Sequence, residues 1–138
     1  MKQLVLFIAI ACSLPALANP PRPVSVPVII TVEINANGNS KVDGHKADLD
    51  SLSAVLGRKM WDKYLATKKM QDKLKIVFKG QVLMGVRGSS LDAIGQAQEE
   101  TLKKLCQAKF GKDFDQLTAA QQSSLKSKFK ILFQKLAW

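Results

Sequence analysis

Histidine and cysteine are scarce in this chain, which holds one histidine and two cysteines among 138 residues. Nucleophilic catalysis by a Cys–His or Ser–His–Asp arrangement would therefore depend on the single imidazole of His45. No His/Cys cluster has the spacing of a metal site, and no glycine pattern is typical of a phosphate-binding loop. Asp48 and Asp50 are explained more simply by helix capping than as a catalytic carboxylate pair. We therefore predict a protein that is not an enzyme, with no catalytic residues, cofactor or metal.

Acidic residues are also few: 11 Asp and Glu stand against 21 Lys and Arg, which gives a formal net charge of +10. Such an excess attracts anionic partners over a range that salt shortens. Candidate partners outside the cytoplasm are phospholipid head groups, lipopolysaccharide, a cell-wall polymer and an acidic protein, while nucleic acid is not expected. Because the lysines are spread along the sequence, a solvated lysine-rich surface explains them more simply than a concentrated patch.

Long apolar runs are missing except near the start, at residues 4–11. About 20 apolar residues are needed to span a bilayer, and this run is shorter. Small residues at Ala16 and Ala18 match the positions that signal peptidase reads. We therefore expect residues 1–18 to be a cleaved signal peptide, and the protein to be exported to the periplasm or secreted. A retained membrane anchor and a lipid-modified Cys12 are the alternatives.

Cleavage would leave one small domain of about 120 residues, with Cys106 as its single cysteine and hence no intrachain disulfide. Residues 19–25 are rich in proline and predict an extended linker. The remainder predicts an α+β fold: a small sheet of three to four strands with two to three helices packed on one face. The first strand is expected at 26–34, followed by a turn at 35–39, a short strand at 40–42 and a second turn from 43 in which His45 lies. A helix from Asp48 to about Lys69 follows, with an apolar face at steps of three and four residues: Leu49, Leu52, Val55 or Leu56, Met60 and Tyr64. A strand at 74–78 is expected to pair with the first.

The second half of the domain is predicted from capping signals. Ser89 or Ser90 begins a second helix that ends at Gly111. Residues 82–86 before it form either a short extension of the preceding strand or a second strand, after a turn at 79–80. Thr118 and Gln121 have the spacing of a capping box at the start of a third helix. The apolar side of that third helix is predicted to carry Leu125, Phe129, Leu132, Phe133 and Leu136.

The terminal helix is basic and amphipathic. Its candidate partner-binding residues are Lys128, Phe129, Lys130, Lys135 and Trp138. Helices of this kind lie on anionic membrane surfaces, but a sheet in so small a chain also needs a helix to cover it. We expect residues 111–138 to pack on the domain formed by residues 26–110. A weak contact with an anionic membrane surface is the alternative role.

Two segments resemble parts of known families. Residues 81–85, Gln-Val-Leu-Met-Gly, resemble the Gln-x-Val-x-Gly inhibitory loop of cystatins, with Leu83 where that family has Val. In cystatins two strands follow the loop, whereas here a helix is predicted from Ser89. We treat this match as coincidental, and a protease inhibitor as the least favoured function.

The second resemblance is longer. Residues 30–44, Ile-Thr-Val-Glu-Ile-Asn-Ala-Asn-Gly-Asn-Ser-Lys-Val-Asp-Gly, predict a strand, an Asn-Gly turn and a short strand ending in Asp-Gly. A Leu-rich helix start at 47–56, a strand at 73–79 and a helix start at 89–94 follow. In this order they resemble the periplasmic domain of the ExbD/TolR family of biopolymer transport proteins, over roughly residues 26–105. The proline-containing lead-in resembles the linker that joins the family's membrane helix to this domain.

That resemblance implies an accessory subunit of a proton-driven motor, whose outer domain dimerises and contacts TonB/TolA-type partners or the cell wall. The family's membrane helix carries a proton-linked aspartate, whereas residues 4–18 contain no Asp. The family also closes with a strand after its second helix, where this chain has a Lys-rich helix. We therefore expect an exported cell-envelope binding or adaptor protein, acting by self-association and by contact with an envelope protein or cell-wall polymer.

A homodimer of the kind that the resemblance implies would use an exposed edge strand near residues 26–34. Such an edge accepts another chain by strand addition, and Val28, Ile30 and Val32 are the candidate contact residues. The rival function is that of a secreted basic protein, membrane-active or host-directed, acting through its C-terminal amphipathic helix.

Overall fold

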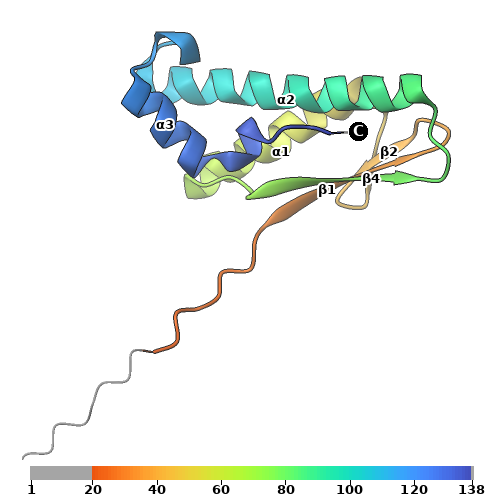
Figure 1. The fold of residues 1–138 in the computed structure, drawn as a ribbon, viewed down its shortest axis with the longest axis horizontal. Coiled ribbons are helices and arrows are strands. Elements are labelled where there is room, and N and C mark those ends of the chain that lie inside the picture. Colours follow the sequence, from red (N-terminus) through yellow and green to blue (C-terminus); the bar gives the residue numbers. More distant parts are fainter. Residues whose placement is uncertain (1–19, 138) are drawn as a thin grey trace, which may run out of the picture.

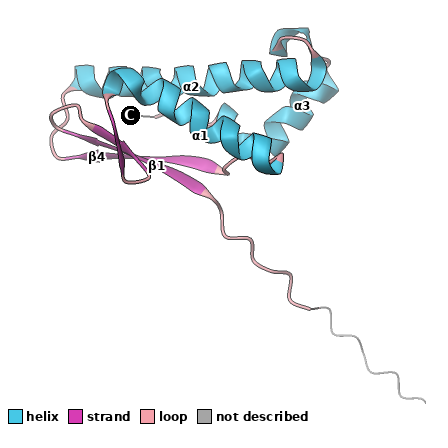
Figure 2. Cartoon of the chain, turned by 180° about the vertical axis from the view of Figure 1, so that it is seen from behind, coloured by secondary structure: helices cyan, strands magenta, loops and turns pink. Residues whose placement is uncertain are grey.

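The computed structural model describes residues 20–137, so the predicted signal peptide and Trp138 lie outside the described residues. The predicted α+β fold is confirmed: a four-stranded mixed sheet carries its helices on one face, and the other face is left open (Figures 1 and 2). The strands are β1 (Ile29–Asn35), β2 (Ser40–Val42), β3 (His45–Ala47) and β4 (Lys73–Lys79). The helices are α1 (Leu52–Thr67), α2 (Met84–Phe110) and α3 (Ala119–Lys128), with short 3-10 turns η1 (Leu49–Ser51), η2 (Phe114–Gln116) and η3 (Lys130–Phe133).

The strand order is β3-β2-β1-β4, which places β1 inside the sheet and leaves β3 and β4 as its edges. β2 runs antiparallel to β1, with Val42 opposite Val32. β4 runs parallel to β1 along its whole length, with Leu74 opposite Ile30, so the predicted pairing of these two strands is confirmed. The parallel connection carries the chain from β1 through the hairpin and α1 to β4, which sets α1 across one face of the sheet.

The first strand begins at Ile29, three residues later than predicted. Pro27 has no N–H to donate to a ladder, and the N–H of Val28 donates instead to the carboxylate of Asp72 at 2.6 Å. Residues 20–28 therefore run away from the sheet as an exposed extended segment (Figure 1).

The hairpin between β1 and β2 has the predicted turn. Gly38 has a φ of +80°, which favours glycine, and the side-chain oxygen of Asn35 accepts hydrogen bonds from the N–H groups of Asn37 and Asn39. The prediction that His45 lies in a turn is wrong, because it begins β3, which pairs with β2. A strand of three residues is too short to give an alternation signal in the sequence.

Helix α1 presents one residue per turn to the core: Leu52, Leu56, Met60 and Tyr64 are buried. Val55 is 36% exposed, so Leu56 is the residue that completes the apolar face. Asp48 precedes the turn η1, and α1 begins only after that turn, later than predicted. Lys68 ends α1 in a left-handed conformation, close to the predicted end.

Helix α2 begins at Met84, well before the predicted caps, so the predicted strand at 82–86 is wrong. Ser90 is buried inside the helix, where its hydroxyl donates to the carbonyl of Val86 rather than capping an N-terminus. Gly111 ends the helix in the left-handed conformation, as predicted.

The C-terminal residues enter the core by a different path from the one predicted. The capping box of Thr118 and Gln121 is present, but α3 ends at Lys128 because Phe129 leaves the helical conformation. The chain then turns through η3 and lies between α2 and the sheet (Figure 1). Hydrogen bonds hold it there, because the side chain of Gln98 donates to the carbonyls of Ile131 and Gln134. The predicted long terminal helix is therefore wrong beyond Lys128.

Candidate functional site

The candidate contact residues of the first strand do not lie at an edge. β1 pairs with β4 along its whole length and with β2 at Val32–Ile34, so the prediction of an exposed edge strand near residues 26–34 is wrong. Ile30 and Val32 are 0% exposed and point into the core, while Val28 precedes the strand and is 44% exposed. The predicted pairing of the first strand with both the hairpin strand and the strand at 74–78 already implies a position inside the sheet, which is incompatible with an edge at β1.

The candidate residues of the terminal segment divide between core and surface. Phe129 is 4% exposed and packs edge-on against the ring of Tyr64, with ring centroids 5.8 Å apart. Lys128, Lys130 and Lys135 are exposed. The apolar stripe of this segment thus faces the core, and Trp138 lies outside the described residues. Within residues 20–137 no helix has the length and apolar character needed to cross a bilayer.

Cys106 and His45, the residues that the predicted nucleophilic arrangements would need, lie on different elements. Cys106 is buried in α2, and burial raises the pKa of its thiol, with the nearby charge of Asp113 adding to the effect. His45 is exposed on β3. In the described part of the chain no three His, Cys, Asp or Glu side chains come together as a metal site.

A basic surface, which was not predicted from the sequence, forms on the open face of the sheet. Alternation along β1 directs Ile30, Val32 and Ile34 toward the helices and the residues between them outward. Register then places five lysines from three strands on the same outer side: Lys41 on β2, Lys46 on β3, and Lys73, Lys75 and Lys79 on β4. We call these five residues the lysine face.

Glu33 is the one acidic residue among the outward positions of the described strands. Its carboxylate lies 2.8 Å from the ammonium of Lys79, and that hydrogen bond lowers the pKa of Glu33, helped by the nearby charge of Lys41. Within residues 20–137 the other ion pair joins Lys59 to Asp43, so four of the five lysines have no carboxylate partner there.

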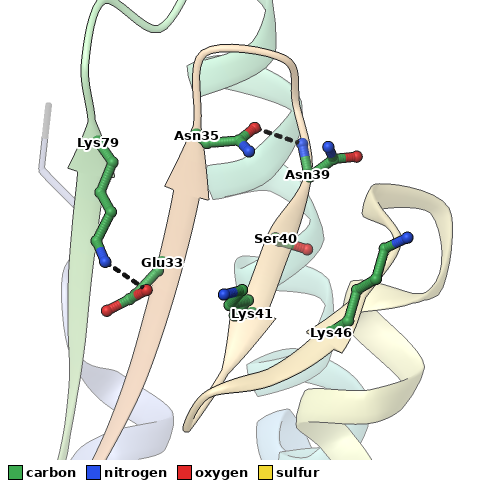
Figure 3. A pocket seen from close by; sticks show the side chains of 7 residues that line it. All are labelled: Glu33, Asn35, Asn39, Ser40, Lys41, Lys46 and Lys79. Carbon is green, nitrogen blue, oxygen red and sulfur yellow. Dashed lines mark hydrogen bonds and ion pairs between the residues drawn. The ribbon is translucent and has the colours of Figure 1, made fainter.

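The lysine face is hollowed near the hairpin turn. A pocket of about 220 Å³ is lined by Glu33, Asn35, Asn39, Ser40, Lys41, Lys46 and Lys79 (Figure 3). Figure 3 shows the chains of Lys79 and Lys46 on opposite sides of this pocket, with Glu33 and Lys41 between them. Three cations and one carboxylate around a small polar hollow form a surface suited to an anionic group.

The edge strand β4 next to the lysine face is covered over only part of its length. The side-chain amide of Gln134 donates to the carbonyl of Leu74 at 2.9 Å and accepts from its N–H at 2.8 Å, as a neighbouring strand would. Successive residues of a strand direct their backbone groups to opposite sides. The N–H and C=O groups of Ile76 and Phe78 therefore face the same way as those of Leu74, and within residues 20–137 neither residue makes a backbone hydrogen bond to a segment on that side.

Sequence reasoning missed the lysine face because it treated the lysines as points along the chain. The signal was present in the alternation of residues 73–79, where Lys73, Lys75 and Lys79 alternate with apolar residues. That pattern predicts lysines on one side of a strand. It does not say that the same side of the sheet is free of helices, since that depends on tertiary packing.

No family model matches the sequence, and no curated protein matches it.

Proposed function

We propose that this chain is an exported adaptor of the cell envelope, a binding protein that resembles the periplasmic domain of ExbD/TolR proteins and holds an anionic envelope protein or cell-wall polymer on its lysine face. The observation that carries the proposal is the gathering of Lys41, Lys46, Lys73, Lys75 and Lys79 on the face of the sheet that the helices leave open.

The charges of the lysine face favour contact with a partner and do not stabilise the fold. Lys41 lies directly opposite Lys46 across β2 and β3, and like charges in such positions oppose strand pairing. A folded domain gains nothing from this juxtaposition by itself. An anionic partner would relieve the repulsion between the two lysines and would be attracted from a distance.

The order of elements supports the family resemblance. A strand, an Asn-Gly turn, a short strand, a helix, a strand parallel to the first and a second helix follow one another as the resemblance implies. Two features depart from it: the additional strand β3, and the path of α3 and η3 where the family closes with a strand. The exposed extended segment 20–28 suits a tether that holds the domain away from a surface.

Packing of the terminal segment favours the adaptor over the membrane-active rival. A helix that lies on a membrane inserts its apolar face among the lipids, but here Leu125, Phe129 and Leu132 are buried in the protein core. The protease-inhibitor hypothesis is weakened in a similar way, because Met84 and Gly85 form the first turn of α2 rather than the tip of a hairpin.

Two measurements on the full chain test the proposal. After expression in bacteria, N-terminal sequencing of the protein from the envelope or exported fraction should begin at Asn19. Recovery in the cytoplasm with Met1 intact would overturn the adaptor function.

The second measurement is co-sedimentation of the exported protein with isolated cell walls and with envelope membranes across a range of salt concentrations. We expect retention that falls as salt rises. A triple variant with Lys41, Lys46 and Lys75 changed to Gln should bind about tenfold more weakly. The matched control changes Lys103, Lys104 and Lys109 on the exposed side of α2 to Gln. Equal losses in both triple variants would show that net charge alone drives binding and would refute a role for the lysine face.

A further inference from the structure

The free part of β4 has a definite extent. It begins after Leu74, whose edge is occupied by Gln134, and ends with the strand at Lys79. Among the residues that the structure describes, the backbone groups of Ile76 and Phe78 are the ones without a partner at this edge, a stretch of about 13 Å at the usual rise of a strand. Unpaired N–H and C=O groups in a row form a template for one more strand.

Positive charge flanks this edge on both sides of the sheet. Lys75 and Lys79 project outward from β4 as part of the lysine face. On the helix side the guanidinium of Arg87 lies over the ring of Phe78, 4.8 Å from its centre. A strand added beside β4 would carry one row of side chains next to the lysines and another next to Ile76 and Phe78, because side chains alternate.

We infer that the anionic partner is a protein that docks as an extended acidic segment, adding as a strand along Ile76–Phe78 with its carboxylates beside Lys75 and Lys79. The inference rests on the proposed function and names the partner's chemistry: acidic residues alternating with apolar or β-branched ones. Backbone hydrogen bonds would supply binding that is independent of sequence, and the lysines would select acidic segments.

A second copy of this chain fits the edge poorly. Two β4 strands paired antiparallel about Val77 would place Lys75 of each copy opposite Lys79 of the other, on the same side of the sheet. Such a dimer would bring four lysines together with Glu33 of each copy as the nearby acid. The charge of the edge thus opposes self-pairing and favours a partner of the opposite sign.

The test uses a short fluorescent peptide in which Asp alternates with Val, titrated against the full exported chain. Fluorescence anisotropy measures its affinity, and two matched peptides report the two parts of the interaction. One has Asn in place of every Asp, and the other carries N-methyl groups on alternate backbone nitrogens, which removes hydrogen-bond donors and keeps the charge. We expect each change to weaken binding about tenfold or more.

Hydrogen exchange of the protein's own amides gives a direct readout. The N–H groups of Ile76 and Phe78 should become protected when the acidic peptide is added, whereas that of Val77, which faces β1, should be protected throughout. The variant with Lys75 and Lys79 changed to Gln should bind the acidic peptide about tenfold more weakly, and the control with Lys103 and Lys104 changed to Gln should bind within about twofold of the unchanged protein.

Three results would overturn the inference. Equal binding of the N-methylated peptide, with no new protection at Ile76 and Phe78, would mean that acidic groups contact the lysine face without strand addition, which leaves the proposed function standing. Protection of these two amides that rises with protein concentration and without peptide would identify a second copy as the occupant. Failure of the acidic peptide to bind, together with salt-sensitive retention on cell walls, would assign the lysine face to a cell-wall polymer.

Discussion

The two faces of the sheet are built from the same strands but differ in burial and in charge. On β1 the inward residues Ile30, Val32 and Ile34 are completely buried, whereas Thr31 and Glu33 between them face outward. The inner face is covered by α1, α2 and the C-terminal segment, and the outer face carries five lysines and no helix within residues 20–137. Alternate residues of the strands thus have different roles: one set stabilises the fold, and the other is available for recognition.

This division predicts that changes on the inner face alter stability and that changes on the outer face alter binding.

The largest expected effect follows from removing the C-terminal segment that covers the inner face. Ending the chain after Thr118 deletes the buried side chains of Leu125, Phe129, Ile131 and Leu132. At about 1.5–3 kcal/mol each, their loss is comparable to the whole stability of a small domain, about 5–15 kcal/mol. We expect the truncated protein to show no cooperative melting by circular dichroism. A truncated protein that melts at the original temperature would show that the inner face does not depend on this segment.

A single substitution on the inner face should have the next largest effect. Ile34→Ala removes a fully buried side chain from β1 and should lower the free energy of unfolding by about 2–5 kcal/mol. Urea unfolding measures this loss. Thr31→Ala on the outer side of the same strand is the matched control, with an expected change below about 1 kcal/mol. Similar losses in the two variants would contradict the division between the faces.

Sequence reasoning predicted the inner face better than the outer one. Steps of three and four residues predicted Leu52, Met60 and Tyr64 on the buried side of α1 and left Val55 or Leu56 open, and the structure selects Leu56. Capping chemistry predicted the start of α3 at Thr118. These signals are local: each depends on residues within one or two turns. They could be predicted because the buried residues of a covering helix recur in the sequence at the spacing of the helix itself.

Consequences that depend on tertiary contacts were predicted less well. The predicted pairing of β4 with β1 is confirmed, but with the hairpin on the other side it places β1 inside the sheet, which contradicts the exposed edge expected there. The end of α3 at Phe129 follows from tertiary packing, since Phe129 turns inward against Tyr64 although the sequence continues in a helical pattern. The lysine face has the same origin, because residues from three strands become neighbours only when the sheet forms.

An intermediate effect is expected where the outer hairpin is tied to the covering helix. The carboxylate of Asp43 accepts from the N–H of Thr31 at 2.7 Å and pairs with Lys59 of α1 at 2.6 Å. Burial alone would raise the pKa of Asp43, but the hydrogen bonds from Lys59 and Thr31 outweigh it and hold that pKa below its ordinary value. A lowered folded-state pKa means that the ionised group stabilises the fold above its unfolded pKa of about 3.9, and that this contribution is lost as pH falls through the folded value.

The substitution Asp43→Asn should therefore cost about 1–2 kcal/mol at neutral pH, because both partners of the carboxylate are affected. Urea unfolding at several pH values checks the sign. The difference in unfolding free energy between the unchanged protein and the Asp43→Asn variant should shrink as pH falls below about 4. A difference that stays constant down to the lowest pH at which both proteins fold would mean that shape, and not charge, accounts for the loss.

The smallest expected effect has the opposite sign. Lys46 lies opposite Lys41 across β2 and β3, so Lys46→Glu replaces a repulsive cross-strand pair by an attractive one. We expect a gain of about 0.2–1 kcal/mol in the free energy of unfolding at low salt, and a gain that disappears at high salt because both side chains are exposed. Lys69→Glu, which makes the same change in net charge at an exposed position outside the sheet, separates the local pair from the general repulsion of a basic chain. If Lys46→Glu stabilises the fold more than Lys69→Glu and also weakens retention on cell walls or envelope membranes, the lysine at this position is retained at the expense of stability, as recognition surfaces often are. If Lys46→Glu destabilises the protein, the lysine face contributes to the fold, and the separation of roles between the two faces fails at β3.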